Sequence, residues 1–122
     1  MGDRANFGFR DRKGDVVFLY GHWAGYEMLT NLAYAVEKAR PRWTDESYAT
    51  RICISQLVGD SWNVETGWGI NVNELGDNEH KVPVIDWAQQ TFTLYEEDLE
   101  TKVFSMTLDN FCTKYSRELV SS

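Results

Sequence analysis

The sequence has little cysteine, proline or histidine, and it has no long hydrophobic run. Each of these three residue types occurs only twice among the 122 residues. No apolar stretch approaches the ~20 residues that a membrane-spanning helix needs, so we expect no membrane partner. The N-terminus lacks the basic and then apolar pattern of a signal peptide. Two histidines leave a zinc site short of its usual ligands, and we predict neither a metal nor a cofactor.

Aromatic and acidic residues, in contrast, are plentiful. Aromatic residues make up 14% of the chain, which excludes a disordered or low-complexity protein. A chain of this length buries roughly two-thirds of its unfolded surface, so it needs no disulfide or metal to fold. The sequence contains no linker, repeat or low-complexity segment. We therefore predict a single domain over residues 1–122.

The formal net charge of −7 is unevenly distributed along the chain. Residues 1–43 have a balance of +2, residues 44–110 of −10, and residues 111–122 of +1. The net value argues against non-specific binding of nucleic acid, which requires cations to neutralise phosphates. The basic first segment still allows a site for a small anion. The alternative is that both segments form ordinary solvated surface.

The two cysteines, Cys53 and Cys112, fall on the apolar faces of predicted helices. Neither belongs to a C-x-x-C or another metal-ligand spacing. We interpret them as reduced thiols in the core of a cytoplasmic protein. A reactive or disulfide-bonded pair is the alternative.

Alternation of apolar and polar residues predicts six strands. The first two, residues 4–10 and 16–20, form a hairpin around the polar turn 11–15. The other four are predicted over residues 68–73, 81–87, 91–95 and 102–106. Pro83 cannot donate a hydrogen bond to a neighbouring strand. We therefore expect its strand at a sheet edge or with a bulge at this point.

A period of 3.6 residues predicts three helices. The first ends before Pro41, and its apolar face consists of Tyr26, Leu29, Leu32, Ala33 and Val36. The second begins with Thr44 as its N-cap, ends at Gly59, and buries Tyr48, Ile52 and Cys53. The third, near the C-terminus, buries Leu108, Phe111, Cys112, Tyr115 and Leu119.

The predicted order of elements is therefore β-β-α-α-β-β-β-β-α. Hairpins and meanders without strand–helix–strand repetition indicate an antiparallel sheet with helices packed on one face. We predict an α+β fold, specifically a two-layer sandwich. The periodicity does not determine the order of the strands within the sheet.

The segment Tyr20–Gly25 is the best candidate for a binding site. It joins a predicted strand to a predicted helix. Free backbone amides at a helix start attract anions, and Gly21 and Gly25 would let the anion approach closely. His22 would add a hydrogen bond, and Trp23 a surface on which a ring can stack. Alternatively, both glycines serve the turn, Trp23 fills the core and His22 caps the helix.

Two arginines extend this candidate site. Arg4 and Arg10 lie on the same face of the first strand, and we predict that their guanidinium groups stand near His22. Arginine suits bidentate recognition of a carboxylate or phosphate. The alternative is that Arg4 pairs with an acid such as Asp3 or one from residues 44–110.

The polar segment Gly76–His80 supplies the second histidine. With His22 it raises the question of a metal, but its spacing matches neither H-E-x-x-H nor the EF-hand calcium loop. An ordinary β-turn is the alternative. The chain has no nucleophile-elbow motif, and the carboxylates of Glu96–Asp98 lie in a charged loop. We therefore assign no catalytic residue.

Two stretches resemble a group of small phage and bacterial proteins. They are the N-terminal M-G-D-R-A and the aromatic-G-H-W-x-G turn at residues 20–25, and the Gly76–His80 segment is similar too. The group carries no established activity, so the resemblance implies no catalytic residue. It implies a phage accessory protein that works in the cytoplasm of the host.

The first functional hypothesis is a non-enzymatic protein that binds a small anionic, nucleotide-like ligand. If the resemblance to phage proteins holds, the ligand would be a host defence signal that the protein sequesters. The predicted site consists of Arg4, Arg10, Gly21, His22, Trp23, Gly25 and His80.

Two further hypotheses remain open. In one, acidic residues occupy the basic groove of a host nucleic-acid-binding or defence enzyme and inhibit it. These residues are Glu74, Asp77, Glu79, Asp86, Glu96, Glu97, Asp98 and Glu100. In the other, the protein is a small phosphohydrolase that uses His22 or His80. Under any of them, a homodimer would bury part of the aromatic surface in a two-fold interface.

Overall fold

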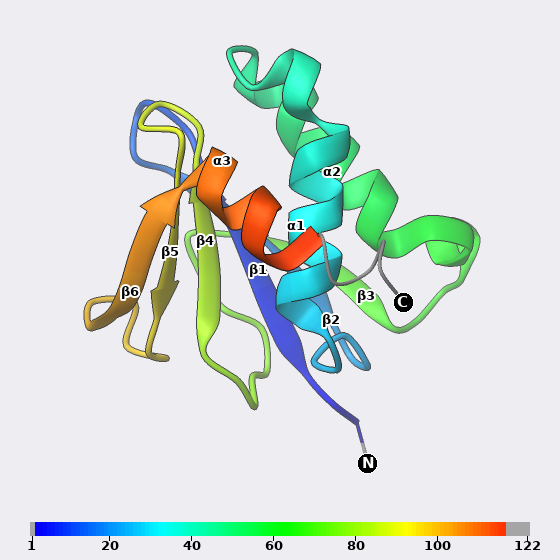
Figure 1. Cartoon of the computed structure of the whole chain (residues 1–122). Coiled ribbons are helices and arrows are strands. Elements are labelled where there is room, and N and C mark those ends of the chain that lie inside the picture. Colours follow the sequence, from blue (N-terminus) through cyan, green and yellow to red (C-terminus); the bar gives the residue numbers. More distant parts are fainter. Residues whose placement is uncertain (1, 117–122) are drawn as a thin grey trace.

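The computed structural model describes residues 2–116, which form one six-stranded sheet with helices on one face (Figure 1). The strands are β1 (Ala5–Arg10), β2 (Val16–Gly21), β3 (Trp68–Val72), β4 (Val82–Asp86), β5 (Thr91–Tyr95) and β6 (Lys102–Thr107). The helices are α1 (Met28–Lys38), α2 (Glu46–Val58) and α3 (Leu108–Phe111). Short helical turns are η1 (Arg40–Arg42), η2 (Gly59–Asn63) and η3 (Cys112–Ser116). The α+β class is confirmed, and the predicted order agrees apart from these short turns.

The sheet is mixed rather than wholly antiparallel. Its strand order is β3-β2-β1-β4-β5-β6, and β1 pairs with β4 in parallel. The other four strand pairs are antiparallel. The prediction of an antiparallel sheet is therefore wrong for one pair, because periodicity shows which face a residue takes and not which strand lies beside it.

The loop between β3 and β4 explains the parallel pair. It begins beside the start of β2, where the Asn73 N–H donates to the Val16 carbonyl over 2.7 Å. It returns to the start of β1, where the Glu79 N–H donates to the Arg4 carbonyl over 2.9 Å. Because the chain has been carried back to the beginning of β1, β4 then runs in the same direction as β1.

The two faces of the sheet have different cores. On the helix face, Ala5, Phe7 and Phe9 pack with Leu19 and with the inner sides of the helices in one large cluster. On the opposite face a smaller cluster is partly covered by loops. It consists of Val16, Phe18, Val82, Val84 and Tyr95, with Leu75 and Leu99 packed against it. The helices therefore cover only one face of the sheet, as predicted.

Two aromatic residues predicted to be buried on helices are exposed. α1 begins at Met28, so Tyr26 precedes it and is 77% exposed. α2 begins at Glu46 with Asp45, not Thr44, as N-cap, and Tyr48 faces solvent under the Arg42 guanidinium, 5.3 Å from the ring centre. Gly59 does cap α2 at its C-terminus, with a φ of 57° that favours glycine.

Pro83 does not place its strand at an edge. β4 lies between β1 and β5. The parallel register with β1 begins only at Gly8 opposite Val84, so the proline lies just before the paired segment. An internal strand can therefore contain this proline because no β1 carbonyl needs its missing N–H.

The C-terminal helix is short but buries the predicted side chains. Leu108, Phe111 and Cys112 are buried, and Tyr115 is partly buried against the main cluster. The ring of Phe111 stacks on that of Phe92, with centroids 4.0 Å apart, which attaches the helix to β5. Leu119 lies outside the described residues.

The two cysteine thiols are buried and are not joined by a disulfide. Burial raises the pKa of the Cys112 thiol to about 12. The pKa of the Cys53 thiol is also raised, mainly by burial and to a smaller extent by the charge of the nearby Cys112.

We expect a thiol reagent such as DTNB to label neither cysteine in the native protein and both after denaturation, because the thiolate is the reactive form. Rapid labelling of the native protein would contradict the buried positions.

Candidate functional site

The segment around Asp3 and Arg4 brings several predicted site residues into one region. The Asp3 N–H donates to the His22 carbonyl over 2.7 Å, and the Asp3 carboxylate contacts His80 Nε2 at 2.5 Å. The Gly25 N–H donates to the Asp3 carbonyl over 3.0 Å. Arg4, Gly21, His22, Gly25 and His80 are therefore neighbours at one end of the sheet.

The cations of this region already have acidic partners. Arg4 Nε lies 3.4 Å from Glu79 Oε1, and Arg4 Nη1 lies 3.8 Å from Asp77 Oδ2. His80 is bound to Asp3, as above. The alternative interpretation of Arg4, pairing with acids from residues 44–110, is the one observed. With three carboxylates around one arginine and one histidine, the region does not favour an anion.

Two of the backbone amides directly after β2 also have partners. The His22 N–H donates to Gly67 (2.8 Å), and the Ala24 N–H donates to Gly21 (3.4 Å). α1 begins only at Met28, and no side chain caps it. The segment Tyr20–Gly25 therefore ends before the start of α1, and His22 does not cap the helix. Its Nδ1 instead lies 2.8 Å from the Tyr20 hydroxyl.

Both glycines of the segment are required by close packing. A side chain at Gly25 would collide with His80 and Asp3, and one at Gly21 would collide with Ala24 and Trp68. The glycines therefore serve the turn, as the alternative interpretation proposed.

A buried asparagine, which the sequence did not single out, fixes the loop that closes this region. Asn6 is fully buried in β1, and its Nδ2 donates to the Asp77 carbonyl over 3.0 Å. Its Oδ1 accepts from the Gly76 N–H over 3.0 Å, and its Nδ2 also lies 3.2 Å from Asn78 Oδ1. The only signal in the sequence is an uncharged polar residue between Ala5 and Phe7.

Removing the Asn6 amide should destabilise the protein. We expect Asn6→Ala to lower the free energy of unfolding by about 2–3 kcal/mol, because buried loop backbone groups lose their partners. Urea denaturation measures this loss. As a control, Asn78→Ala leaves the bonds from Asn6 to the backbone intact and should cost at most about 1 kcal/mol. Equal losses in both variants would contradict the role of Asn6.

The pKa of Glu79 is below its ordinary value. The largest cause is the Arg4 backbone N–H, which donates to the Glu79 carboxylate over 2.8 Å. We expect a carbon-13 NMR titration to place this pKa below the usual value of about 4.3. A lowered pKa contributes stability above the unfolded-state pKa, and that stability is lost as the pH falls through the folded-state value. In Arg4→Gln the pKa of Glu79 should rise because the guanidinium charge is lost. It should stay below the ordinary value because the backbone N–H of residue 4 still donates to the carboxylate. An ordinary pKa in the unmodified protein would contradict this contact.

Arg10 is far from this region. It pairs in register with Val16, whereas Ala5 at the other end of β1 pairs with Gly21. Five residues of strand separate these positions by roughly 17 Å. The prediction that Arg10 stands near His22 is therefore wrong, because a shared face does not bring together the two ends of a strand.

Arg10 instead lines a cavity on the sheet face opposite the helices. The cavity has a volume of about 330 Å³. Its lining residues come from four neighbouring strands and the turn after β4, and they are Arg10, Val84, Asp86, Gln89, Thr91, Thr93, Tyr95, Lys102 and Ser105. Within residues 2–116, neither Arg10 nor Lys102 forms an ion pair. We call this the sheet-face cavity.

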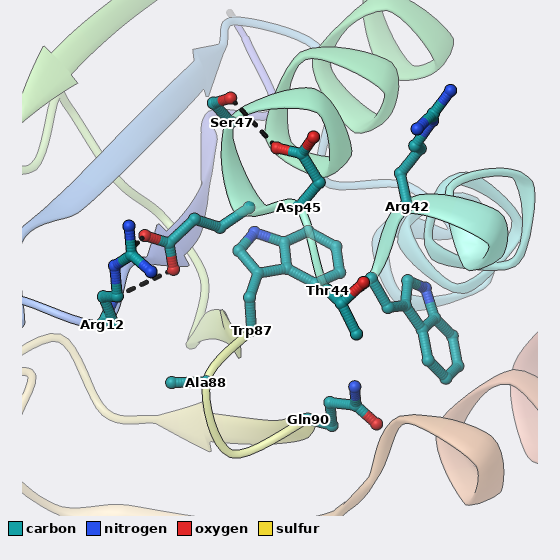
Figure 2. Close-up of a pocket in the computed structure, with 10 residues that line it drawn as sticks. Arg12, Arg42, Thr44, Asp45, Ser47, Trp87, Ala88 and Gln90 are labelled. Carbon is teal, nitrogen blue, oxygen red and sulfur yellow. Dashed lines mark hydrogen bonds and ion pairs between the residues drawn. The ribbon is translucent and has the colours of Figure 1, made fainter.

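A larger cavity, of about 700 Å³, lies between the β1–β2 turn and the start of α2 (Figure 2). One of its two arginines, Arg12, is paired with an acid. The Arg12 backbone N–H and guanidinium both contact the Glu46 carboxylate, at 3.0 and 3.5 Å. Arg42 points away from Trp87 in Figure 2 and stacks on Tyr48. Size alone therefore does not make this cavity a site for a charged ligand.

Trp23 lines a third cavity, of about 360 Å³, between α1, α2 and the end of β2. It is 65% exposed, so it does not fill the core. The ring of His22 meets it edge-on at 4.5 Å, and a side chain at Gly67 would contact it. The other aromatic residues of this cavity are Phe7, Tyr26, Tyr34 and Trp68.

Gly25 and His80 line a fourth cavity, together with Glu79, Glu96 and Glu97. Its lining has three glutamates but a single lysine, Lys81, so the excess negative charge would repel a phosphate group. Its geometry therefore gives no support to a phosphohydrolase. Of the acidic residues proposed to contact a basic partner, Asp86 lies apart in the sheet-face cavity.

Among the residues described, no group of three or more histidine, cysteine or acidic side chains is arranged to hold a metal ion. No helix within residues 2–116 has the length and hydrophobicity to span a bilayer. The chain matches no protein-family model, and no curated protein or solved structure shows significant similarity to it.

Proposed function

We propose that this protein binds a small molecule with a phosphate or similar anionic group in the sheet-face cavity, without transforming it. The observation that carries the proposal is that two cations, Arg10 and Lys102, line the same cavity and form no ion pair among residues 2–116. A guanidinium presents two parallel N–H donors to a phosphate, and an ammonium adds a point charge.

The positions of the two cations suit a ligand larger than a free ion. Arg10 is in register with Asp86 and Thr91, whereas Lys102 is opposite Tyr95, four residues further along the same strands. The cations therefore lie at opposite ends of the cavity. A volume of about 330 Å³ falls at the small end of the range for ligand pockets, about 300–1,000 Å³.

The remaining polar groups favour a ligand that also carries hydroxyl or amino groups. The Ser105 hydroxyl donates to the Phe92 carbonyl over 3.1 Å, so the Thr93 hydroxyl donates to Ser105 Oγ over 2.9 Å. Both oxygens keep acceptor positions for a donor group of the ligand. Asp86 accepts one bond from the Gln89 N–H at 3.0 Å, which leaves its carboxylate other acceptor positions. A sugar phosphate or a nucleotide combines an anionic end with such donors.

Calorimetric titration tests this proposal directly. Ribose 5-phosphate and adenosine monophosphate should bind, while ribose and adenosine should bind at least about tenfold more weakly. Arg10→Gln and Lys102→Gln should each weaken binding by about tenfold to a hundredfold, as expected for losing a charged hydrogen-bond partner. Binding should also weaken as sodium chloride is added.

The control is Arg51→Gln, which removes an exposed cation from α2 and should leave affinity unchanged. Inorganic phosphate added alone separates recognition of the anion from recognition of the whole ligand. If no phosphate compound binds at millimolar concentration, or if binding is insensitive to both cavity substitutions, the proposed function is wrong.

A further inference from the structure

One edge of the sheet presents unpaired backbone groups. In the described part of the chain β3 pairs only with β2, and the pair is antiparallel. The ladder is anchored at both ends, because the His22 N–H donates to the Gly67 carbonyl and the Asn73 N–H donates to the Val16 carbonyl. Antiparallel bonding alternates between residues, so every second residue of β3 points its N–H and C=O away from β2. Those residues are Trp68, Ile70 and Val72.

The two edges of the sheet differ in their protection against further strand pairing. At the other edge, β6 carries Lys102, and its register with β5 shifts between Leu94 and Tyr95. Charged residues and bulges are devices that block pairing between edges. β3 has the sequence Trp-Gly-Ile-Asn-Val, with no charge, no proline and a continuous register. It is therefore the edge that can accept another strand.

Exposed apolar side chains accompany this edge. Ile70 and Val72 are 56% and 61% exposed, and Trp62 and Val64 on the preceding segment are 56% and 60% exposed. A hollow of about 310 Å³ lies beside the strand. Its lining residues are Leu19, Val58, Ser61, Trp62, Val64, Trp68, Gly69 and Ile70. A contiguous apolar surface next to a free strand edge is typical of a protein interface.

We propose that β3 pairs antiparallel with β3 of a second copy of this chain, around a two-fold axis at Ile70. In this register Ile70 faces Ile70 of the second copy, and Trp68 faces Val72. These are the residues whose N–H and C=O groups point outward, so each of the three residue pairs would form two hydrogen bonds, about six in all. The two sheets would join into one.

The absence of acidic residues at this edge and the symmetry of the register favour a second copy as the occupant. Two molecules that each carry −7 repel, and an interface between them needs a surface without acidic residues. β3 and the exposed side chains beside it provide such a surface. In the proposed register the nearest acids, Glu65 and Glu74, are opposite Leu75 and Thr66 of the second copy and not opposite each other. Residues directly opposite each other in an antiparallel pair share a face. The exposed apolar side chains of β3 in the two copies therefore lie side by side.

Sedimentation equilibrium measures the association. The unmodified chain should have a mass about twice 14.1 kDa at micromolar concentration. Ile70→Lys should weaken dimerisation at least about tenfold, since two ammonium groups would meet at the axis. Val103→Lys, an equivalent change on β6 at the other edge, should leave the dimer intact. A monomeric unmodified chain, or equal effects of the two lysines, would overturn the proposal.

Cross-linking tests the register independently of whether a lysine variant folds poorly. Opposite residues in a hydrogen-bonded antiparallel pair have Cα atoms about 5.5 Å apart, within disulfide range. Ile70→Cys should therefore cross-link to a dimer under mild oxidation. Val72→Cys, although more exposed, should not, because its counterpart lies roughly 14 Å away along the strand. Cross-linking of Val72→Cys, or of neither variant, would overturn this register.

Discussion

The parallel pairing of β1 with β4 is the interaction on which the rest of the structure depends. It joins the β1–β2–β3 meander to the β4–β5–β6 meander through only three residue pairs, from Gly8 opposite Val84 to Arg10 opposite Asp86. The loop that makes this pairing possible is fixed by the buried amide of Asn6. Since Arg10 is the last residue of β1, the same pairing moves its guanidinium next to β4, β5 and β6. The fold therefore forms the sheet-face cavity from segments that are distant in sequence.

The distribution of charge explains why an acidic protein can offer a site for an anion. Several cations elsewhere have acidic partners: Arg4 pairs with Glu79, Arg12 with Glu46, and Lys81 with Glu96. Such exposed pairs contribute little stability, but they cancel the local field. Arg10 and Lys102 lie on a sheet face whose other polar groups are mainly hydroxyls. A net charge describes the whole molecule, whereas a ligand meets the few charges within a Debye length of about 10 Å.

Much of the fold was predictable because it depends on local periodicity. β5 was predicted with its observed bounds, and Gly59 was correctly assigned as the end of α2. The errors concern contacts between distant segments. Neither the parallel pair nor the internal position of Pro83 has a signature in the sequence around it. Tyr26 and Tyr48 matched the apolar positions of helices, but α1 begins after Tyr26 and Tyr48 remains on the solvent side.

The candidate site was harder to predict than the fold. Residue types identified groups able to bind an anion, but Arg10 lies apart from the other six predicted residues, and the seven do not line one common cavity. Gly25 and His80 line one cavity, Trp23 another and Arg10 a third. Arg4 was recognisable as a cation, yet only the fold shows that Asp77 and Glu79 return to it. Lys102 had no distinguishing pattern, because its importance comes from lying across the sheet from Arg10.

The most direct test of the account is a map of amide chemical-shift changes on adding adenosine monophosphate. Our account predicts that the largest changes fall on four separate segments, at Arg10, Asp86, Thr93 and Ser105, which meet only in the sheet-face cavity. Changes concentrated on residues 20–25 and 76–80 would instead support the site expected from the sequence alone. That result, or an absence of changes at Arg10 and Ser105, would contradict the proposed cavity.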